Sequence, residues 1–292
     1  MPELPEIEAY LAALRPRIEG ATLVTTRVAS FSLLRTFDPP VDASHGRKVL
    51  GLHRIGKRVS IDLQDDLHLV VHLMVAGRFK WTDQPKTIPK RGGLAAFDFS
   101  TGSLLLTEAG TKRRASLSVI RTEDLTGIDP GGIEIADATV EQFTDALLAG
   151  RHTLKRALTD ARNISGIGGA FADEILFVAQ LSPTQMNTNL SPEEIETLFE
   201  ACRTVLADWT RTRIAETGDG FPTKVTAFHP DMAVHGKYGE DCTVCGAPIQ
   251  RIVAGGRETN YCPGCQTNGR ILADRSMSRL LKDDWPRHLD EL

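Results

Sequence analysis

The stretch 242-CTVCGAPIQRIVAGGRETNYCPGC-265 decides the fold of the C-terminal region, because it carries two C-x2-C pairs sixteen residues apart. Glycine and proline place each pair on a tight turn, which directs two thiolates toward one tetrahedral centre. We therefore expect one Zn2+, structural because four protein ligands leave no open position, and no organic cofactor. The ligands are Cys242, Cys245, Cys262 and Cys265. Disulfides are the alternative, but no secretion signal favours them.

The residues between the two pairs predict a β-hairpin. PIQRIV and ETNY have the pattern of short strands, and AGGR joins them with Arg257 near the tip. An arginine on a short, rigid hairpin is suited to entering a DNA groove or to clamping a phosphate. An exposed charge with no ligand is the alternative. The fifth cysteine, Cys202, falls in a helical pattern and is expected to be a buried small hydrophobe.

Helical periodicity dominates the region before the cysteines, over residues 138–149, 153–160, 170–180 and 192–213. The sequence SGIGGAFADE (165–174) lies just before one of these helices. Its Gly168 and Gly169 free backbone N–H groups to point at an anion, as in a clamp on a phosphate backbone. An ordinary glycine turn between helices is the alternative.

The region before these helices predicts β-structure. From Ala21 to Arg121 short alternating stretches are separated by Gly and Pro, which indicates an antiparallel sandwich or barrel. Apolar residues at helical spacing predict a leading helix over Glu3–Arg15. The fold class is therefore α+β multidomain. The expected divisions are a β-sandwich with its leading helix (1–130), a helical domain (131–237), a zinc finger (238–270) and a helical tail (271–292).

The N-terminal stretch MPELPEIE suggests chemistry. Removal of Met1 would leave the secondary amine of Pro2 at the terminus, and an α-amino group is partly neutral and nucleophilic near pH 7 because its pKa is about 8. Attack on a sugar anomeric carbon gives an iminium, which favours later eliminations. Glu3 and Glu6 could transfer protons. The alternative is that proline merely begins a helix whose dipole the two acids complement.

Composition limits the classes of function. The 292 residues are 41% hydrophobic and 25% charged, with net charge −4 and a pI near 6.1. No apolar run is long enough to cross a bilayer, so we expect a monomeric cytoplasmic protein without membrane contact. An acidic pI argues mildly against nucleic-acid binding, yet five basic residues and no acid lie between Ala43 and Ile61.

Four motifs together resemble one family across nearly the whole chain. They are MPELPEIE, Gly56-Lys57-Arg58, GIGGAFADEIL and the cysteine hairpin, whose Arg257 stands five residues before the third cysteine. In this order they resemble the formamidopyrimidine-DNA glycosylase/endonuclease VIII family of base-excision repair enzymes, nearer to the formamidopyrimidine branch. In that family MPELPEIE resembles the N-terminal signature and GIGG the helix-two-turn-helix motif.

The resemblance implies a fold, a partner and roles for individual residues. Double-stranded DNA with a damaged base or abasic site would bind between a β-sandwich and a helical-plus-zinc domain, and the damaged nucleotide would be flipped out. Pro2 would displace the base and form a Schiff base, and Glu3 would protonate the leaving group. Lys57 would bind phosphate and assist β,δ-elimination. Glu6 and Glu174 would hold the nucleophile and the interdomain site.

Three departures from the family pattern bear on substrate preference. Gly169 replaces the asparagine of GxGN, which removes a side-chain amide donor. Met74 stands one place earlier than in the usual HLxM. Met74 or Val75 is therefore the candidate for the side chain that fills the space left in the DNA duplex by the flipped nucleotide. A core role for Met74 stays open. The loop AGTKRRASL lacks the usual phenylalanine, and Arg113 and Arg114 are its candidate DNA contacts.

The expected activity is a bifunctional glycosylase and abasic-site lyase for oxidised bases, with formamidopyrimidine and 8-oxoguanine favoured. The alternatives are an endonuclease VIII-like enzyme for oxidised pyrimidines and a family member that binds damaged DNA without catalysis. A zinc-ribbon RNA-binding protein is a third possibility, and it predicts no preference for damaged duplex.

Overall fold

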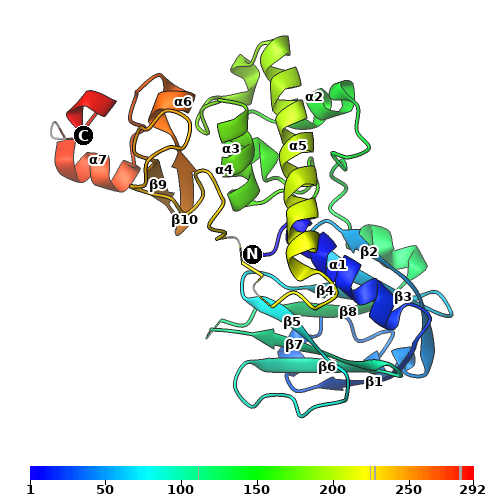
Figure 1. The fold of residues 1–292 in the computed structure, drawn as a ribbon. Helices are drawn as coiled ribbons and strands as arrows, with labels where there is room; N and C mark the ends of the chain where they lie inside the picture. The colour runs from blue at the N-terminus through cyan, green and yellow to red at the C-terminus, as the bar shows by residue number, and fades with distance from the viewer. Residues whose placement is uncertain (111, 224, 227, 283–284) are drawn as a thin grey trace. The chain divides into compact units, whose positions relative to one another are not determined.

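The computed structural model describes residues 1–292 apart from 111, 224, 227, 283 and 284, and apart from the side chains of 275–277 (Figure 1). The chain divides into two compact units. The first combines residues 1–130 with 208–227, and the second combines 131–207 with 228–292. The sequence predicted 131–237 as a single helical domain, so the structure assigns 208–227 differently.

Helix α1 (Leu4–Ile18) begins the first unit. Its apolar spacing buries one face completely, including Ile7, Leu11 and Leu14, and this face packs on strands β2 and β3. The helix starts where the Glu3 amide donates to the Glu6 carboxylate at 2.9 Å, half of a capping box. It runs three residues further than predicted, to Ile18.

Eight antiparallel strands follow α1, in the order β5-β7-β6-β1-β2-β3-β4-β8. Their bounds are β1 (Thr22–Val28), β2 (Arg47–Ile55), β3 (Arg58–Leu63), β4 (Leu67–His72), β5 (Gly77–Thr82), β6 (Gly93–Phe99), β7 (Gly102–Glu108) and β8 (Ser116–Arg121). The first four and the last four strands in this order form two halves joined at β1 and β2 (Figure 1). One apolar core takes Phe97 and Leu104 from one half and Ile61 and Leu69 from the other, which confirms the predicted sandwich.

The segment 208–227 joins the first unit through packing and charge. Val225 is buried in the core of the sandwich, and Phe221 packs against it. Phe221 also contacts the ring of Tyr10 in α1, with centroids 5.7 Å apart. These contacts explain why the end of a long helix and the loop after it cluster with the N-terminal strands.

The second unit is helical where the sequence predicts helices. Its helices are α2 (Val140–Leu148), α3 (Leu154–Leu158), α4 (Gly169–Val178) and the first part of α5 (Pro192–Thr217). Helix α5 continues four residues beyond the predicted end at Arg213. Ser191 and Glu194 form a capping box at its start, with reciprocal hydrogen bonds of 2.8 and 3.2 Å.

The cysteine region forms the predicted hairpin, β9 (Gln250–Ala254) and β10 (Arg257–Tyr261), followed by the short helix α6 (Pro263–Thr267). The tail is less helical than predicted, with α7 limited to Arg275–Leu281. It packs on the hairpin: the Val253 amide donates to the Asp274 carboxylate at 2.7 Å, and the Leu272 amide donates to the Tyr261 hydroxyl at 2.7 Å. A membrane-crossing helix is absent from the part of the chain that the structure describes.

Candidate active site and nucleic-acid interface

The N-terminus is held in place by buried polar contacts. Pro2 and Glu3 are both buried, and Glu6 is 1% exposed. Besides receiving the Glu3 amide, Glu6 accepts from Arg213 Nε at 3.3 Å through its other oxygen. Arg213 Nη2 donates in turn to the Thr226 carbonyl at 2.9 Å. The first turn of α1 is therefore fixed from a distant part of the sequence, a link that sequence reasoning missed.

The charges around this terminus shift several pKa values. Burial, with a further contribution from the Glu3 charge, raises the pKa of Glu6 to about 7. Burial lowers the pKa of the Met1 amine, which also feels Glu3, Glu6 and Lys57. The pKa of Lys57 is likewise lowered by burial, against the opposing charge of Glu3. The Met1 amine, Glu6 and Lys57 thus all feel the Glu3 charge, and the pKa of Glu6 near 7 suits proton transfer near neutral pH.

A cavity of about 520 Å³ lies on the outer face of β3, β4 and β8. The strand register places Arg58, His72 and Ser116 in one row across the three strands, and all three line the cavity. Its other lining residues are Arg35, Met74, Arg113, Arg114, Ser118, Gly127 and Ile128. Four guanidinium groups around one cavity are suited to phosphate. We call this the arginine pocket; the sequence analysis did not include Arg35 or His72.

His72 is neutral in the arginine pocket. Its Nδ1 accepts the Met74 amide at 2.9 Å, so the proton of the neutral ring is on Nε2. Burial first, and then the charges of Arg58 and Lys57, lower the pKa of His72 to about 4. His72 can therefore donate one hydrogen bond to a phosphate oxygen without titrating near pH 7.

In the turn after β4, the two candidates for filling the DNA duplex, Met74 and Val75, differ in exposure. Met74 is half-buried, has a left-handed backbone with φ of 53°, and lines the arginine pocket. Val75 is 58% exposed. Arg78 Nη1 holds the turn by donating to the carbonyls of Val75 and Gly77, at 3.1 and 2.6 Å. Of the two, Val75 is the side chain presented to solvent.

The loop that carries Arg113 and Arg114 is anchored by Glu108. This carboxylate is buried and accepts the amide of Arg114 at 2.9 Å and that of Ala115 at 3.0 Å. Its position at the end of β7 gave no signal in the sequence, because a glutamate at a strand end is ordinarily solvated. Thr111 of this loop lies outside the described residues.

In the second unit, Gly168 is the N-cap of α4 and Gly169 is its first residue. Gly166, at φ of 78°, makes the turn before them and needs the freedom of glycine. A Cβ built on Gly169 would meet nothing within 4 Å. Gly168 is buried and Gly169 half-buried, and a larger side chain fits at Gly169.

Glu174 holds the chain that leads to the cysteine hairpin. Its carboxylate accepts the backbone amides of Ala233, Val234 and His235 at 2.8–2.9 Å. Burial raises the pKa of Glu174, although the three amides oppose this shift. Within its unit, Glu174 positions a loop.

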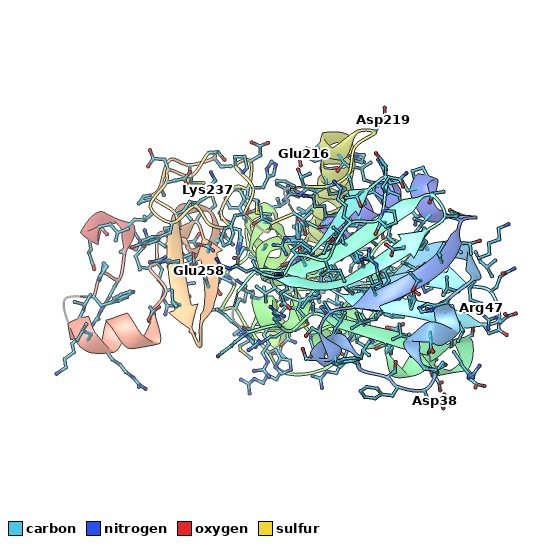
Figure 2. The ribbon with its side chains drawn as sticks, turned by 90° about the horizontal axis from the view of Figure 1, so that it is seen from below. Asp38, Arg47, Glu216, Asp219, Lys237 and Glu258 are labelled. Atoms are coloured by element: carbon cyan, nitrogen blue, oxygen red, sulfur yellow. The ribbon has the colours of Figure 1, made fainter. Side chains whose placement is uncertain are left out.

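The neighbouring Asp173 ties helices α3 and α4 to the hairpin. It pairs with Lys155 at 2.6 Å and with His235 Nδ1 at 2.9 Å, and it accepts the Asn260 amide at 3.1 Å. Lys155 Nζ also donates to the carbonyl of Glu258, a hairpin residue labelled in Figure 2, at 2.7 Å. Lys155, which was not predicted from the sequence, thereby fixes strand β10 close to the tip of the hairpin.

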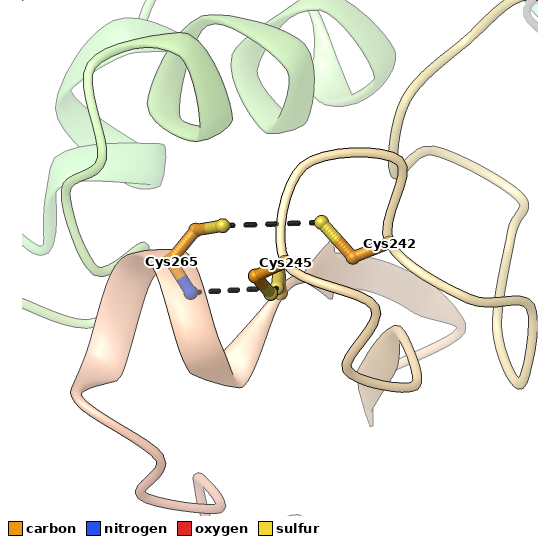
Figure 3. A group of neighbouring side chains, drawn as sticks. Cys242, Cys245 and Cys265 are labelled. Atoms are coloured by element: carbon orange, nitrogen blue, oxygen red, sulfur yellow. Dashed lines mark hydrogen bonds between the residues drawn. The ribbon is translucent and has the colours of Figure 1, made fainter.

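The four hairpin cysteines form one cluster, with all four Sγ atoms within 4.8 Å of one another (Figure 3). Such a group of thiolates fits a tetrahedral Zn2+ and leaves no free position, as the sequence predicted. Arg257 is exposed at the tip, next to Gly255 and Gly256, which both have positive φ. The hairpin therefore presents Arg257 on a tight turn.

Known proteins share this architecture across the chain. Residues 1–115 match the formamidopyrimidine-DNA glycosylase N-terminal domain, 127–216 match the H2TH domain of the same enzymes, and 239–268 match the zinc finger found in FPG and IleRS. The crystal structure of a Lactococcus lactis formamidopyrimidine-DNA glycosylase bound to abasic-site DNA has a TM-score of 0.79 at 24% identity, covering 91% of this chain and 99% of that one. A structure of MutM with DNA containing carbocyclic 8-oxo-G gives the same TM-score and identity, with 91% and 100% covered.

The fold and the clustered site define a DNA repair glycosylase. Among curated relatives, the formamidopyrimidine-DNA glycosylase of Carboxydothermus hydrogenoformans is 33% identical over 271 residues, 91% of this chain and all of the relative. That of Thermus thermophilus is 32% identical over 282 residues, 92% of this chain and again all of the relative. The chain belongs to the formamidopyrimidine-DNA glycosylase family, as its sequence motifs indicate. Its enzyme class is thus DNA glycosylase with abasic-site lyase activity.

Zinc binding is tested by changing one cysteine of the cluster. Cys262→Ser removes one of four thiolates, so we expect the zinc content to fall well below one ion per chain, because an incomplete tetrahedral set binds weakly. Metal content after dialysis measures this. Cys202→Ala is the control, because Cys202 is buried in α5 outside the cluster and its loss should leave one ion bound. Equal zinc in both variants would contradict the assignment.

Glu6 makes stability depend on pH. Because folding raises its pKa from 4.5 to about 7, its contribution to stability is complete below pH 4.5 and is lost as pH rises through about 7. The loss is of the order of 3 kcal/mol. Urea unfolding at several pH values should show this decline in the wild type and a flatter profile in Glu6→Gln. Glu19→Gln, an exposed residue just after α1, should keep the wild-type slope, and a Glu6→Gln profile as steep as the wild type rules out this role.

Proposed function

We propose that the chain excises oxidised bases from double-stranded DNA and then cuts the strand, using the imino terminus that Pro2 would have once Met1 is removed. The observation that carries this proposal is the buried N-terminal turn, where Pro2 and Glu3 are buried, the Glu3 amide and Arg213 hold the Glu6 carboxylate, and burial lowers the pKa of Lys57 beside the Glu3 charge. A nucleophile of this kind needs no metal or organic cofactor.

In the proposed reaction the Pro2 nitrogen attacks C1′ of the damaged nucleotide while the N-glycosidic bond breaks. Glu3 gives a proton to the leaving base or to the sugar oxygen, and the sugar ring opens to an iminium on Pro2. The iminium makes the C2′ proton acidic, so its loss to water or to the Glu3 carboxylate left by the first step breaks the C3′–O bond. Loss of the C4′ proton in the same way then breaks the C5′–O bond. Lys57 would bind a flanking phosphate during these steps, with its amine partly desolvated as its lowered pKa indicates.

DNA binding would use groups in both units. The arginine pocket and neutral His72 suit phosphate oxygens in the first unit. In the second unit the start of α4, where Gly169 has open space around its Cα, would suit a phosphate, and the exposed Arg257 would suit a phosphate or a groove. Val75, exposed on a fixed turn, is the better candidate to fill the space left by a flipped base.

Two solved neighbours support the choice of substrate class. A mutant of the Lactococcus lactis enzyme has been crystallised with DNA containing Fapy-dG, and the wild-type enzyme with DNA containing an oxidised pyrimidine. We propose formamidopyrimidine and 8-oxoguanine as preferred substrates for this chain, with oxidised pyrimidines as the alternative. Because its substrate would be chromosomal DNA, we propose a cytoplasmic location, at the nucleoid in a bacterium.

The nucleophile is tested by borohydride trapping on abasic duplex DNA. We compare the chain that begins with a free Pro2 with the same chain carrying an uncleaved N-terminal extension. In the extended chain the Pro2 nitrogen is an amide and cannot attack. The free chain should give a covalent complex and the extended chain should give at least about a hundredfold less. Pro2→Gly, which replaces the secondary amine and frees the terminus, should also reduce trapping strongly.

Binding of the same duplex by anisotropy is the control for this experiment. All three proteins should bind abasic DNA with similar affinity, because Pro2 supplies chemistry and few contacts. Binding without any trapping by the free chain would support a non-catalytic damaged-DNA-binding protein and overturn the proposed reaction. Equal trapping by the extended chain would show that another amine is the nucleophile.

Gly169 provides a test of the helix N-terminus. Because space is open around its Cα, Gly169→Asn should place an amide donor at the start of α4 and tighten duplex binding by about 2–10-fold, equivalent to about 0.5–1.5 kcal/mol. Gly169→Ala is the matched control, since it changes the backbone preference without adding a donor. An asparagine variant that binds no more tightly than the alanine variant would remove this helix end from the interface.

A further inference from the structure

Two phenylalanines are unusually exposed beside the arginine pocket. Phe31 and Phe37 are 79% and 75% exposed, although the chain has only 6% aromatic residues. They lie on either side of Arg35, whose side chain lines the pocket. Neither ring has a role in the reaction described above or in the core.

The segment that carries them is fixed to strand β8. Leu34 forms a parallel bridge with Leu117, and the Arg35 amide donates to the Leu117 carbonyl at 2.9 Å. Thr36 Oγ1 both donates to the Val119 carbonyl and accepts the Val119 amide, each at 2.9 Å. Residues 34–36 are therefore tied to β8 by one bridge, one backbone hydrogen bond and the Thr36 hydroxyl, and the exposure of the rings is not that of a loose terminus.

Burial alternates along this segment, because Arg35 and Phe37 are exposed whereas Leu34 and Thr36 are half-buried. Arg35 lines the pocket that Ser116 and Ser118 also line, and Phe37 is presented to solvent two residues further on. Phe31 begins the short helical turn Phe31–Leu33, and Arg35 Nη1 closes this turn by donating to the Ser32 carbonyl at 2.6 Å. Asp38, just beyond Phe37, is exposed and extends away from the strands (Figure 2).

We propose that Phe31 and Phe37 form a stacking platform for unpaired bases of a DNA strand whose phosphates bind in the arginine pocket. A positively charged groove next to exposed aromatic rings is the combination that binds single-stranded nucleic acid, because every base has a face that can stack. Four guanidinium groups favour this polyanion over a protein partner. This inference rests on the proposed function, in which DNA is the substrate. It adds that the preferred DNA has unpaired bases next to the lesion.

The test measures binding of labelled DNA by anisotropy with the full-length protein. The probes are an abasic-site duplex and the same duplex with three unpaired bases beside the lesion. The double variant Phe31→Ala/Phe37→Ala should lose about tenfold or more in affinity for the second probe, since each stacked base contributes about 1–3 kcal/mol. It should lose much less for the fully paired duplex. Phe31→Trp/Phe37→Trp should retain or increase the preference for unpaired bases.

Two controls separate stacking from other effects. Leu50→Ala removes a 58% exposed side chain from β2 and should change neither affinity. Arg35→Ala should lower the affinity for both probes and reduce the salt dependence of binding. The double phenylalanine variant should keep the wild-type salt dependence, because stacking of rings on bases releases no counterions. The stacking platform would be overturned if the double variant kept wild-type affinity for the probe with unpaired bases, or if it lost equal affinity for both probes. The rings would then be assigned to binding a protein partner.

Borohydride trapping keeps this result separate from the proposed reaction. The double variant should still form the covalent complex at saturating abasic duplex, because neither Phe31 nor Phe37 takes part in the proposed reaction at Pro2. If the wild type failed to trap at all, the proposed reaction would fail while the anisotropy comparison would still decide the platform.

Discussion

The hydrogen-bonded contact between Glu6 and Arg213 is the constraint on which the proposed catalysis depends. Chain termini are ordinarily mobile, and a mobile amine would lose the advantage of a fixed approach to the sugar. Here the first turn of α1 is closed by the Glu3 amide on one oxygen of Glu6 and by Arg213 on the other. An otherwise free end of the chain thereby becomes a defined position next to Lys57 and Glu3.

The same contact explains an unusual protonation balance. A buried carboxylate beside a second carboxylate would be strongly disfavoured, and the raised pKa of Glu6 is the consequence. Arg213 offsets part of this penalty, and its guanidinium also lies over the Trp209 ring at 5.5 Å. Near pH 7 the Glu6 side chain can therefore hold or release a proton, which is useful beside an amine that must lose one to become a nucleophile.

Local patterns in the sequence predicted much of the fold and part of the site. Some features depend only on residues close together in the sequence, and these were predicted. They are the four cysteines, the glycine turn before α4, the alternating strands and the apolar face of α1. The bond between Glu6 and Arg213 spans 207 residues and no local pattern encodes it. The arginine pocket was missed for a similar reason, because Arg58, His72 and Ser116 become neighbours only through the register of three strands. Burial of Glu108 likewise depends on the loop that it holds.

The most direct measurement of the central claim is to locate the covalent bond itself. After borohydride trapping on abasic DNA, digestion and peptide mass spectrometry should show that Met1 is absent and that the sugar remnant is attached to the nitrogen of Pro2. A remnant on Lys57 or on another lysine, or a trapped protein that still carries Met1, would contradict the account.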